Sequence, residues 1–291
     1  MKKIKKIIKG LLITMLIFIV GAVGLTGCGN KAANSQGATS EKKVVKIGIT
    51  TPDDIIWDAV KKKAAEDNIE IQTVCFSNVN INEVLAKGDV DLNAFQHYAY
   101  FEKNKADLGL DLVSLGDMYI LRLDIYSKKY KSLDELPNGA KIAVPNDAVN
   151  IGRSIKVFEE AGLITLKEGT GNTPEVADIA SNPKNIQLVE IEHSQIVRSL
   201  DDVDAAIVFV KDAVDAKLDP SKDPIYVNKI DPTDDNLKQY INLIAARAED
   251  KDNETYKKVV KAFNSEEVAQ AIFEQFKHGA IPAWDEKYAK Q

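Results

Sequence analysis

Two successive series of alternating strand and helix patterns constrain the fold of this chain more than any other feature. Strand-like apolar stretches of the first series lie at 44–49, 69–74 and 90–95, and helical spacing occurs at 56–66, 82–86 and 98–108. A second series of strand-like stretches lies at 141–144, 187–191 and 205–208. Strands separated by helices predict βαβ units and mainly parallel sheets, and therefore an α/β fold.

The pattern between the two series divides the chain into two expected lobes. Residues 112–126 are apolar with little helical character, a further strand is expected at 240–245, and 254–276 supplies two amphipathic helices. We expect the chain to cross between lobes near 120–127 and to return near 232–245. The expected bounds are 44–124 and 240–291 for lobe 1 and 125–239 for lobe 2. Two crossings form a hinge, and the cleft between the lobes is the natural ligand site.

The N-terminus has the pattern of an export signal. Five lysines precede residue 10, an apolar run covers 11–25, and the sequence LTGC closes it at Cys28. The run is shorter than the roughly 20 apolar residues of a spanning helix. LTGC resembles a bacterial lipobox, so we expect a signal peptide at 1–27 and a lipid on Cys28, the alternative being an uncleaved anchor helix. Residues 28–43 lack large apolar side chains and should form a flexible tether.

The charge balance excludes some partners. The whole chain has 38 basic and 44 acidic residues, a net charge of −6. Removing 1–27 takes away five lysines and no acids, which leaves 33 against 44, or −11. An acidic surface repels nucleic acid and anionic lipids. The lipid on Cys28, and not the protein surface, would therefore hold the protein at the extracytoplasmic face of the membrane.

The motifs of common enzymes are absent from the sequence. With Cys28 lipidated, Cys75 is the remaining cysteine, so no intramolecular disulfide is possible, and Cys75 is expected to be a buried small hydrophobe. No GxSxG motif, P-loop or dinucleotide fingerprint occurs. We therefore expect a binding protein without a cofactor, not an enzyme.

The segment 150–153 has the features of an anion site. Asn150 and Arg153 are three residues apart, so they share one face of a helix that starts just after 145–147. Free N–H groups at a helix start favour an anion, and an arginine fork can grip a carboxylate with two bonds. The alternative is a solvated arginine on an amphipathic helix.

A second candidate cluster follows the third expected strand. Phe95, His97 and Tyr100 lie where a strand passes into a helix, and open α/β sheets bind ligands at the carboxyl ends of their strands. These rings could wall an apolar pocket, or they could be ordinary core. A divalent-cation site built from His97, His193 and carboxylates such as Glu190 is a further alternative.

Several motifs in order resemble the methionine-binding lipoproteins of ABC importers, the NlpA-type family. They are GDVDLNAFQH at 88–97, IYSKK at 125–129, SLDELP at 132–137, VPND at 144–147 followed by Asn150 and Arg153, LDDVDAA at 200–206 and IPAW at 281–284. The similarity covers 44–284. It implies a type II periplasmic-binding-protein fold, and a monomer that captures methionine and delivers it to a membrane permease with its ATPase.

The resemblance also implies roles for individual residues. Phe95, His97 and Tyr100 match three positions of the family's aromatic cage for the methionine side chain. Asn150 and Arg153 match its carboxylate clamp, and Asn242 matches an asparagine of the returning strand.

Four positions depart from the family's pattern. Phe209 stands where an asparagine usually helps to hold the ligand, and Val79 stands where a tyrosine is expected. Arg122 and Asp124 replace a neutral segment of the crossing strand, and they could pair with each other or bind charges on a ligand. These changes suggest specificity for a related amino acid or short peptide, the alternative being that methionine still binds.

Overall fold

The computed structural model describes residues 42–52, 54–77 and 79–290. The expected signal peptide, Cys28 and all but the end of the expected tether lie outside the described residues. In chain order the strands are β1 (Lys43–Ile49), β2 (Ile69–Cys75), β3 (Leu92–His97), β4 (Leu112–Leu121), β5 (Leu123–Tyr126), β6 (Lys141–Pro145), β7 (Thr165–Leu166), β8 (Ile179–Ser181), β9 (Gln187–Ile191), β10 (Ala205–Phe209), β11 (Pro224–Tyr226), β12 (Ile241–Arg247) and β13 (Ala280–Pro282). The helices are α1 (Ile55–Ala65), α2 (Ile81–Ala86), α3 (Tyr98–Leu108), α4 (Ala148–Glu160), α5 (Val210–Asp215), α6 (Glu254–Phe263) and α7 (Glu266–Phe276).

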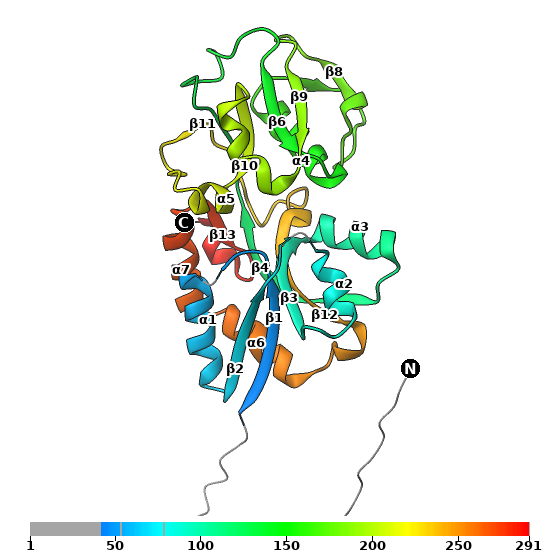
Figure 1. The fold of residues 1–291 in the computed structure, drawn as a ribbon, viewed down its shortest axis with the longest axis vertical. Helices are drawn as coiled ribbons and strands as arrows, with labels where there is room; N and C mark the ends of the chain where they lie inside the picture. The colour runs from blue at the N-terminus through cyan, green and yellow to red at the C-terminus, as the bar shows by residue number, and fades with distance from the viewer. Residues whose placement is uncertain (1–41, 53, 78, 291) are drawn as a thin grey trace, which may run out of the picture. The chain divides into compact units, whose positions relative to one another are not determined.

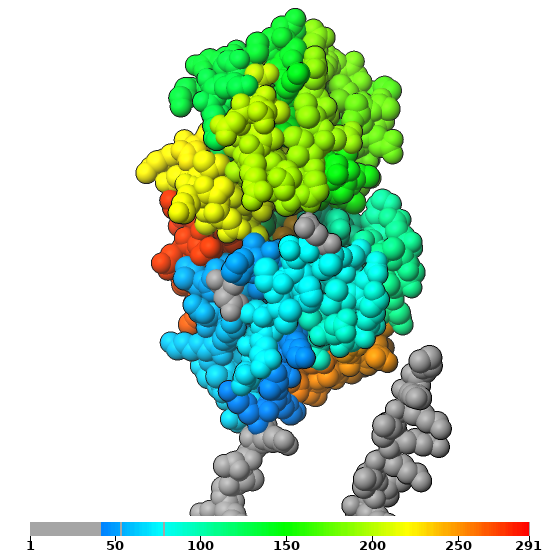
Figure 2. All heavy atoms as spheres, viewed as in Figure 1, coloured from blue at the N-terminus to red at the C-terminus, as the bar shows by residue number. Residues whose placement is uncertain are grey.

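The strands form two separate larger sheets, as expected for two α/β lobes (Figure 1). The first sheet has six strands in the order β13-β4-β12-β3-β1-β2, and the second has five in the order β11-β5-β10-β6-β9. A small third sheet pairs β7 with β8. In Figure 2 the green and yellow residues of the second sheet and the blue and cyan residues of the first occupy different parts of the visible surface.

The expectation of mainly parallel sheets is wrong, because both larger sheets are mixed. β1 pairs in parallel with β2 and β3, and β6 pairs in parallel with β9 and β10. The crossing strand β5 is antiparallel to β10, and the returning strand β12 is antiparallel to β3. Each of these two strands runs against the βαβ strands of the sheet that it enters.

Two chain segments connect the sheets. β4 ends in the first sheet at Leu121 and β5 begins in the second at Leu123, so Arg122 alone separates them. The backbone N–H of Arg122 donates to the carbonyl of Gly279 (3.0 Å), and its carbonyl accepts from the N–H of Val210 (3.2 Å). The chain returns between β11 and β12. The polar contacts of the Arg122 backbone fix the position of the first connection.

Each sheet has its own core, built by the expected residue alternation. Val45, Ile47 and Ile49 of β1 are at most 2% exposed and pack with Trp57 and Val60 of α1. In the second sheet, alternate residues of β5, β6 and β10 pack with α4. Burial of these apolar side chains stabilises each sheet and its helices through the hydrophobic effect.

Two further findings concern Cys75 and the length of the helices. Cys75 is exposed at the end of the edge strand β2, so the expectation that it is buried is wrong. It follows Val74 in a strand that has one neighbour, β1, and therefore an open side. Within the described ranges, we find no helix with the length and apolar character required to cross a membrane.

Candidate ligand-binding site

The start of α4 buries the two residues of the expected anion grip. Asp147 caps the helix, and its Oδ1 accepts a hydrogen bond from the backbone N–H of Asn150 (2.9 Å). Asn150 and Arg153 are 5% and 3% exposed. The alternative of a solvated arginine is therefore wrong. Residues 148–160 form a helix with a broad buried face, and both polar side chains lie on it.

The Arg153 guanidinium is buried, and no carboxylate of the described residues forms an ion pair with it. Its Nη2 donates to the backbone carbonyl of Leu121, while no described residue provides a hydrogen-bond partner for the buried Nη1. The centroids of the Tyr240 and Phe209 rings lie 4.6 and 5.2 Å from its Cζ, so the guanidinium contacts two aromatic rings.

Burial lowers the pKa of Arg153 to about 10, and the nearby Tyr240 and the charge of Asp124 only partly oppose this. Arg153 stays charged at neutral pH. A buried cation with an open donor is suited to an incoming anion.

His97 joins the first sheet to α4 through a single tautomer. Its Nδ1 accepts from the backbone N–H of Tyr100 (3.2 Å), so the proton lies on Nε2, which donates to Oδ1 of Asn150 (3.0 Å). The amide of Asn150 is oriented so that its Oδ1 faces His97, because its Nδ2 donates to Oδ2 of Asp147 (2.9 Å). Burial, and then the charge of Arg153, lower the pKa of His97 to about 3, so the ring is neutral.

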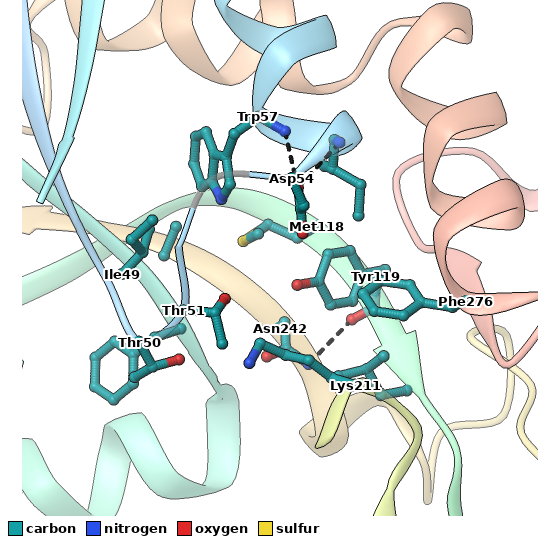
Figure 3. A pocket seen from close by; sticks show the side chains of 14 residues that line it. Ile49, Thr50, Thr51, Asp54, Trp57, Met118, Tyr119, Lys211, Asn242 and Phe276 are labelled. Carbon is teal, nitrogen blue, oxygen red and sulfur yellow. Dashed lines mark hydrogen bonds between the residues drawn. The ribbon is translucent and has the colours of Figure 1, made fainter. Parts of the chain in front are cut away.

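Of the two remaining expected cage residues, Phe95 lines a small cavity and Tyr100 contacts Phe95. Phe95 and Tyr100 meet edge to face, with ring centroids 6.3 Å apart. Phe95 and Asn242 line a cavity of about 40 Å³ that also contacts Thr51, Tyr119 and Lys211 (Figure 3). The Nδ2 of Asn242 donates to the carbonyl of Tyr119 (3.3 Å), which leaves its Oδ1 available as an acceptor.

This cavity is too small for an amino acid in the arrangement described, and Arg153, Asn150 and His97 are not among the residues that line it. Small-molecule pockets enclose about 300–1,000 Å³, whereas 40 Å³ accommodates a few waters. Binding of a larger solute therefore requires the cavity to widen.

The departures from the family's pattern fall into three environments. Phe209 is 8% exposed and contacts Arg153, so it belongs to the anion site. Val79 is 54% exposed, and nothing in the described structure brings it to Arg153.

Arg122 and Asp124 pair with each other, with Nη2 and Oδ2 3.0 Å apart. Asp124 is fully buried and also accepts from the backbone N–H of Asn228 (3.0 Å), while Arg122 also donates to the carbonyl of Pro220 (2.7 Å). Each charge of this pair therefore has a partner within the chain.

In the described part of the chain, the histidines of the alternative cation site are engaged with other partners. The Nε2 of His193 lies 2.7 Å from Oδ2 of Asp212, and the Nε2 of His97 is occupied by Asn150. Across 42–52, 54–77 and 79–290, no three His, Cys, Asp or Glu side chains gather as a metal ion requires.

Three contacts of the site were not predicted from the sequence. Asp147 orients Asn150, Tyr240 packs on Arg153 and His97, and the carbonyl of Leu121 binds Arg153. Asp147 could have been found, since Asp is a preferred N-cap residue. Tyr240 and Leu121 come from distant parts of the chain, and their sequence neighbours give no local signal.

Comparison with known proteins identifies the family. The family model described as NlpA lipoprotein matches residues 45–284. The chain belongs to the NlpA lipoprotein family. The D-methionine-binding lipoprotein MetQ of Escherichia coli K12 is 38% identical over 271 residues, which cover 91% of this chain and 95% of that relative.

Solved structures of similar proteins share the fold. A nutrient binding protein from Burkholderia cenocepacia, bound to methionine, is 41% identical, with a TM-score of 0.76 over 82% of this chain and 99% of that one. The substrate binding protein of a methionine transporter from Streptococcus pneumoniae is 33% identical, with a TM-score of 0.75 over 83% and 96%. The expected two-lobed binding-protein fold is confirmed.

Proposed function

We propose that this protein is the substrate-binding lipoprotein of an ABC importer. It captures methionine or a related amino acid or short peptide and delivers it to a membrane permease, while a partner ATPase supplies the energy. The observation that carries the proposal is the buried Arg153, whose Nη1 has no partner among the described residues. A ligand carboxylate would accept from this nitrogen and from the neighbouring side-chain amide of Asn150. The NlpA relatives described as methionine-binding support this ligand class.

The ligand enters by separation of the two lobes. The segments through Arg122 and between β11 and β12 are the proposed hinge, and widening at these connections enlarges the 40 Å³ cavity. Closure then surrounds the ligand, and the closed form is the one that the permease recognises.

No bond is made or broken in this chain. His97 is neutral and hydrogen-bonded on both ring nitrogens, so its role is to position Asn150. The protein acts as a monomeric binding module and not as an enzyme. A lipid on Cys28 anchors it at the extracytoplasmic face, and residues 28–43 tether the folded part.

Isothermal titration calorimetry tests the proposal. L-methionine, D-methionine, glycyl-methionine and a panel of other amino acids are titrated into the wild type and Arg153→Met. Arg198→Met is the matched control, because Arg198 is exposed. We expect binding of one or more of these compounds, loss of it in Arg153→Met, and no change in the control. Equal affinity in all three proteins would remove the carboxylate clamp.

Phe209 favours an amino-acid-like ligand other than methionine as the second candidate for the importer's solute. It lies 5.2 Å from Arg153, where an asparagine of the family would offer a polar group to the ligand. A ring there favours a ligand with apolar atoms beside its carboxylate. Native mass spectrometry of the purified protein identifies which small molecule accompanies it and decides between methionine and another solute.

A further inference from the structure

A second charged pair lies at the same sheet edge as Arg153. The parallel strands β6, β9 and β10 end at 145, 191 and 209, and ligands bind at the carboxyl ends of such strands. α4, with Arg153, follows β6. His193 follows β9, and Asp212 lies in the first turn of α5 after β10.

His193 connects this pair to the anion site through Phe209. Its ring stacks on Phe209 with centroids 5.0 Å apart and planes 3° from parallel. Its Nε2 lies 2.7 Å from Oδ2 of Asp212, which fixes the ring orientation. Burial lowers the pKa of His193, but the hydrogen bond and the charge of Asp212 outweigh it and raise the net pKa. Phe209 in turn lies 5.2 Å from Cζ of Arg153.

The two rings that hold Arg153 differ in how they are held. Tyr240 has a polar anchor, since its hydroxyl donates to the carbonyl of Asn172 (3.3 Å), and its ring also meets His97 edge to face. Phe209 has no polar atom in its side chain. Phe209 is held by packing in the core of the second sheet, and the stacked His193 is a further ring contact that restrains its orientation.

We propose that His193, held by Asp212, is a positioning residue that fixes Phe209 against Arg153 and thereby sets how strongly the site prefers a free carboxylate. The inference rests on the proposed function, because it assigns the selectivity of that same site. It predicts a ligand with an unmodified carboxylate and discrimination against compounds in which this group is an amide.

The test compares methionine with methioninamide, which lacks the carboxylate charge. Calorimetry on the purified full-length protein in detergent gives the ratio of the two affinities. In His193→Ala we expect this ratio to fall about three- to tenfold, the range of a lost cation–π restraint. His193→Phe retains a stacking ring without the bond to Asp212 and should restore the ratio only in part, which a loss of folding stability would not produce.

The chain offers a matched control for the loss of a His–Phe stack. His278 stacks on Phe273 at 5.1 Å, far along the chain from the anion site. His278→Asn should leave the ratio at its wild-type value. If His193→Ala does not fold, Asp212→Asn replaces it, since it removes the charge that holds His193 and should lower the ratio in the same direction.

A ligand-free measurement separates this inference from the proposed function. The four arginines, Arg122, Arg153, Arg198 and Arg247, give four Nε–H signals in NMR spectra of arginine-labelled protein. Arg153→Lys identifies the signal of Arg153, which ring currents make sensitive to Phe209. We expect this signal to shift in His193→Ala and to stay in place in His278→Asn.

The outcomes are distinct. An unmoved Arg153 signal, or an unchanged affinity ratio in His193→Ala, overturns the inference while methionine binding itself stands. Failure of the wild type to bind any compound overturns the proposed function, and the Arg153 signal then still decides whether His193 positions this group.

Discussion

Replacing Arg153 with methionine should abolish ligand capture at little cost to the stability of the fold. Methionine is unbranched and fills much of the same volume without a charge. Burial lowers the pKa of Arg153 to about 10 on folding, so burial of the charge opposes folding by about 3 kcal/mol. Because the folded-state pKa is the lower one, this cost is complete at pH 7 and is relieved only as the pH rises through about 10.

The contacts of the guanidinium offset this cost. The bond to the carbonyl of Leu121 contributes about 1.5–3 kcal/mol, and each aromatic ring contributes about 0.5–2 kcal/mol. The burial cost cancels much of this stabilisation, so we expect Arg153→Met to lower the free energy of unfolding by less than truncation of an apolar core side chain does. Ile155→Ala on the same helix, a truncation of a fully buried side chain, should instead lose about 2–5 kcal/mol.

Arg153→Met should weaken ligand binding strongly, although it changes the stability of the fold little. Loss of one side of a desolvated charge pair costs about 2–5 kcal/mol, or about 30- to 5,000-fold in Kd. Urea unfolding measures the stability of each variant, and calorimetry with methionine measures its affinity. A variant that unfolds far more easily yet binds as tightly as the wild type would refute the argument, because Arg153 would then be a structural residue.

Three other changes test separate parts of the structure. The pKa of His97 is about 3 in the folded protein and 6.5 for an unperturbed histidine, so the contribution of neutral His97 to stability is complete above pH 6.5 and is lost as the pH falls toward 3. Between pH 7 and pH 4, the midpoint of urea unfolding should therefore decline less steeply in His97→Gln than in the wild type. Arg122→Met leaves Asp124 as an unpaired buried charge and should destabilise the protein by about 3–5 kcal/mol in urea unfolding, whereas Arg122→Met with Asp124→Asn should recover most of this loss. Cys28→Ser should move the protein from the membrane fraction to the soluble fraction with ligand affinity unchanged, and continued membrane retention would favour an uncleaved anchor helix.

Local sequence patterns were enough to predict most elements and their division between two sheets. These patterns involve only residues close together in the sequence. The structure has the strands expected at 141–144 and 187–191 and the helix expected at 98–108 within a residue of the expected bounds. The spacing of Asn150 and Arg153 likewise places both on one face of α4, because a helix brings residues three apart together.

The contacts that these residues make came from the tertiary fold alone. The partners of Arg153 are Leu121, Phe209 and Tyr240, which lie 32, 56 and 87 positions away in the sequence. Strand direction was also undetermined, since alternation is the same for parallel and antiparallel pairing, and the mixed sheets follow from where the chain crosses. The position of a strand in a sheet, and what covers its last residue, depend on the tertiary fold, so the exposure of Cys75 could not be predicted from its sequence neighbours. Local patterns specify secondary structure, but a buried charge acquires its partners from packing between segments that the sequence keeps far apart.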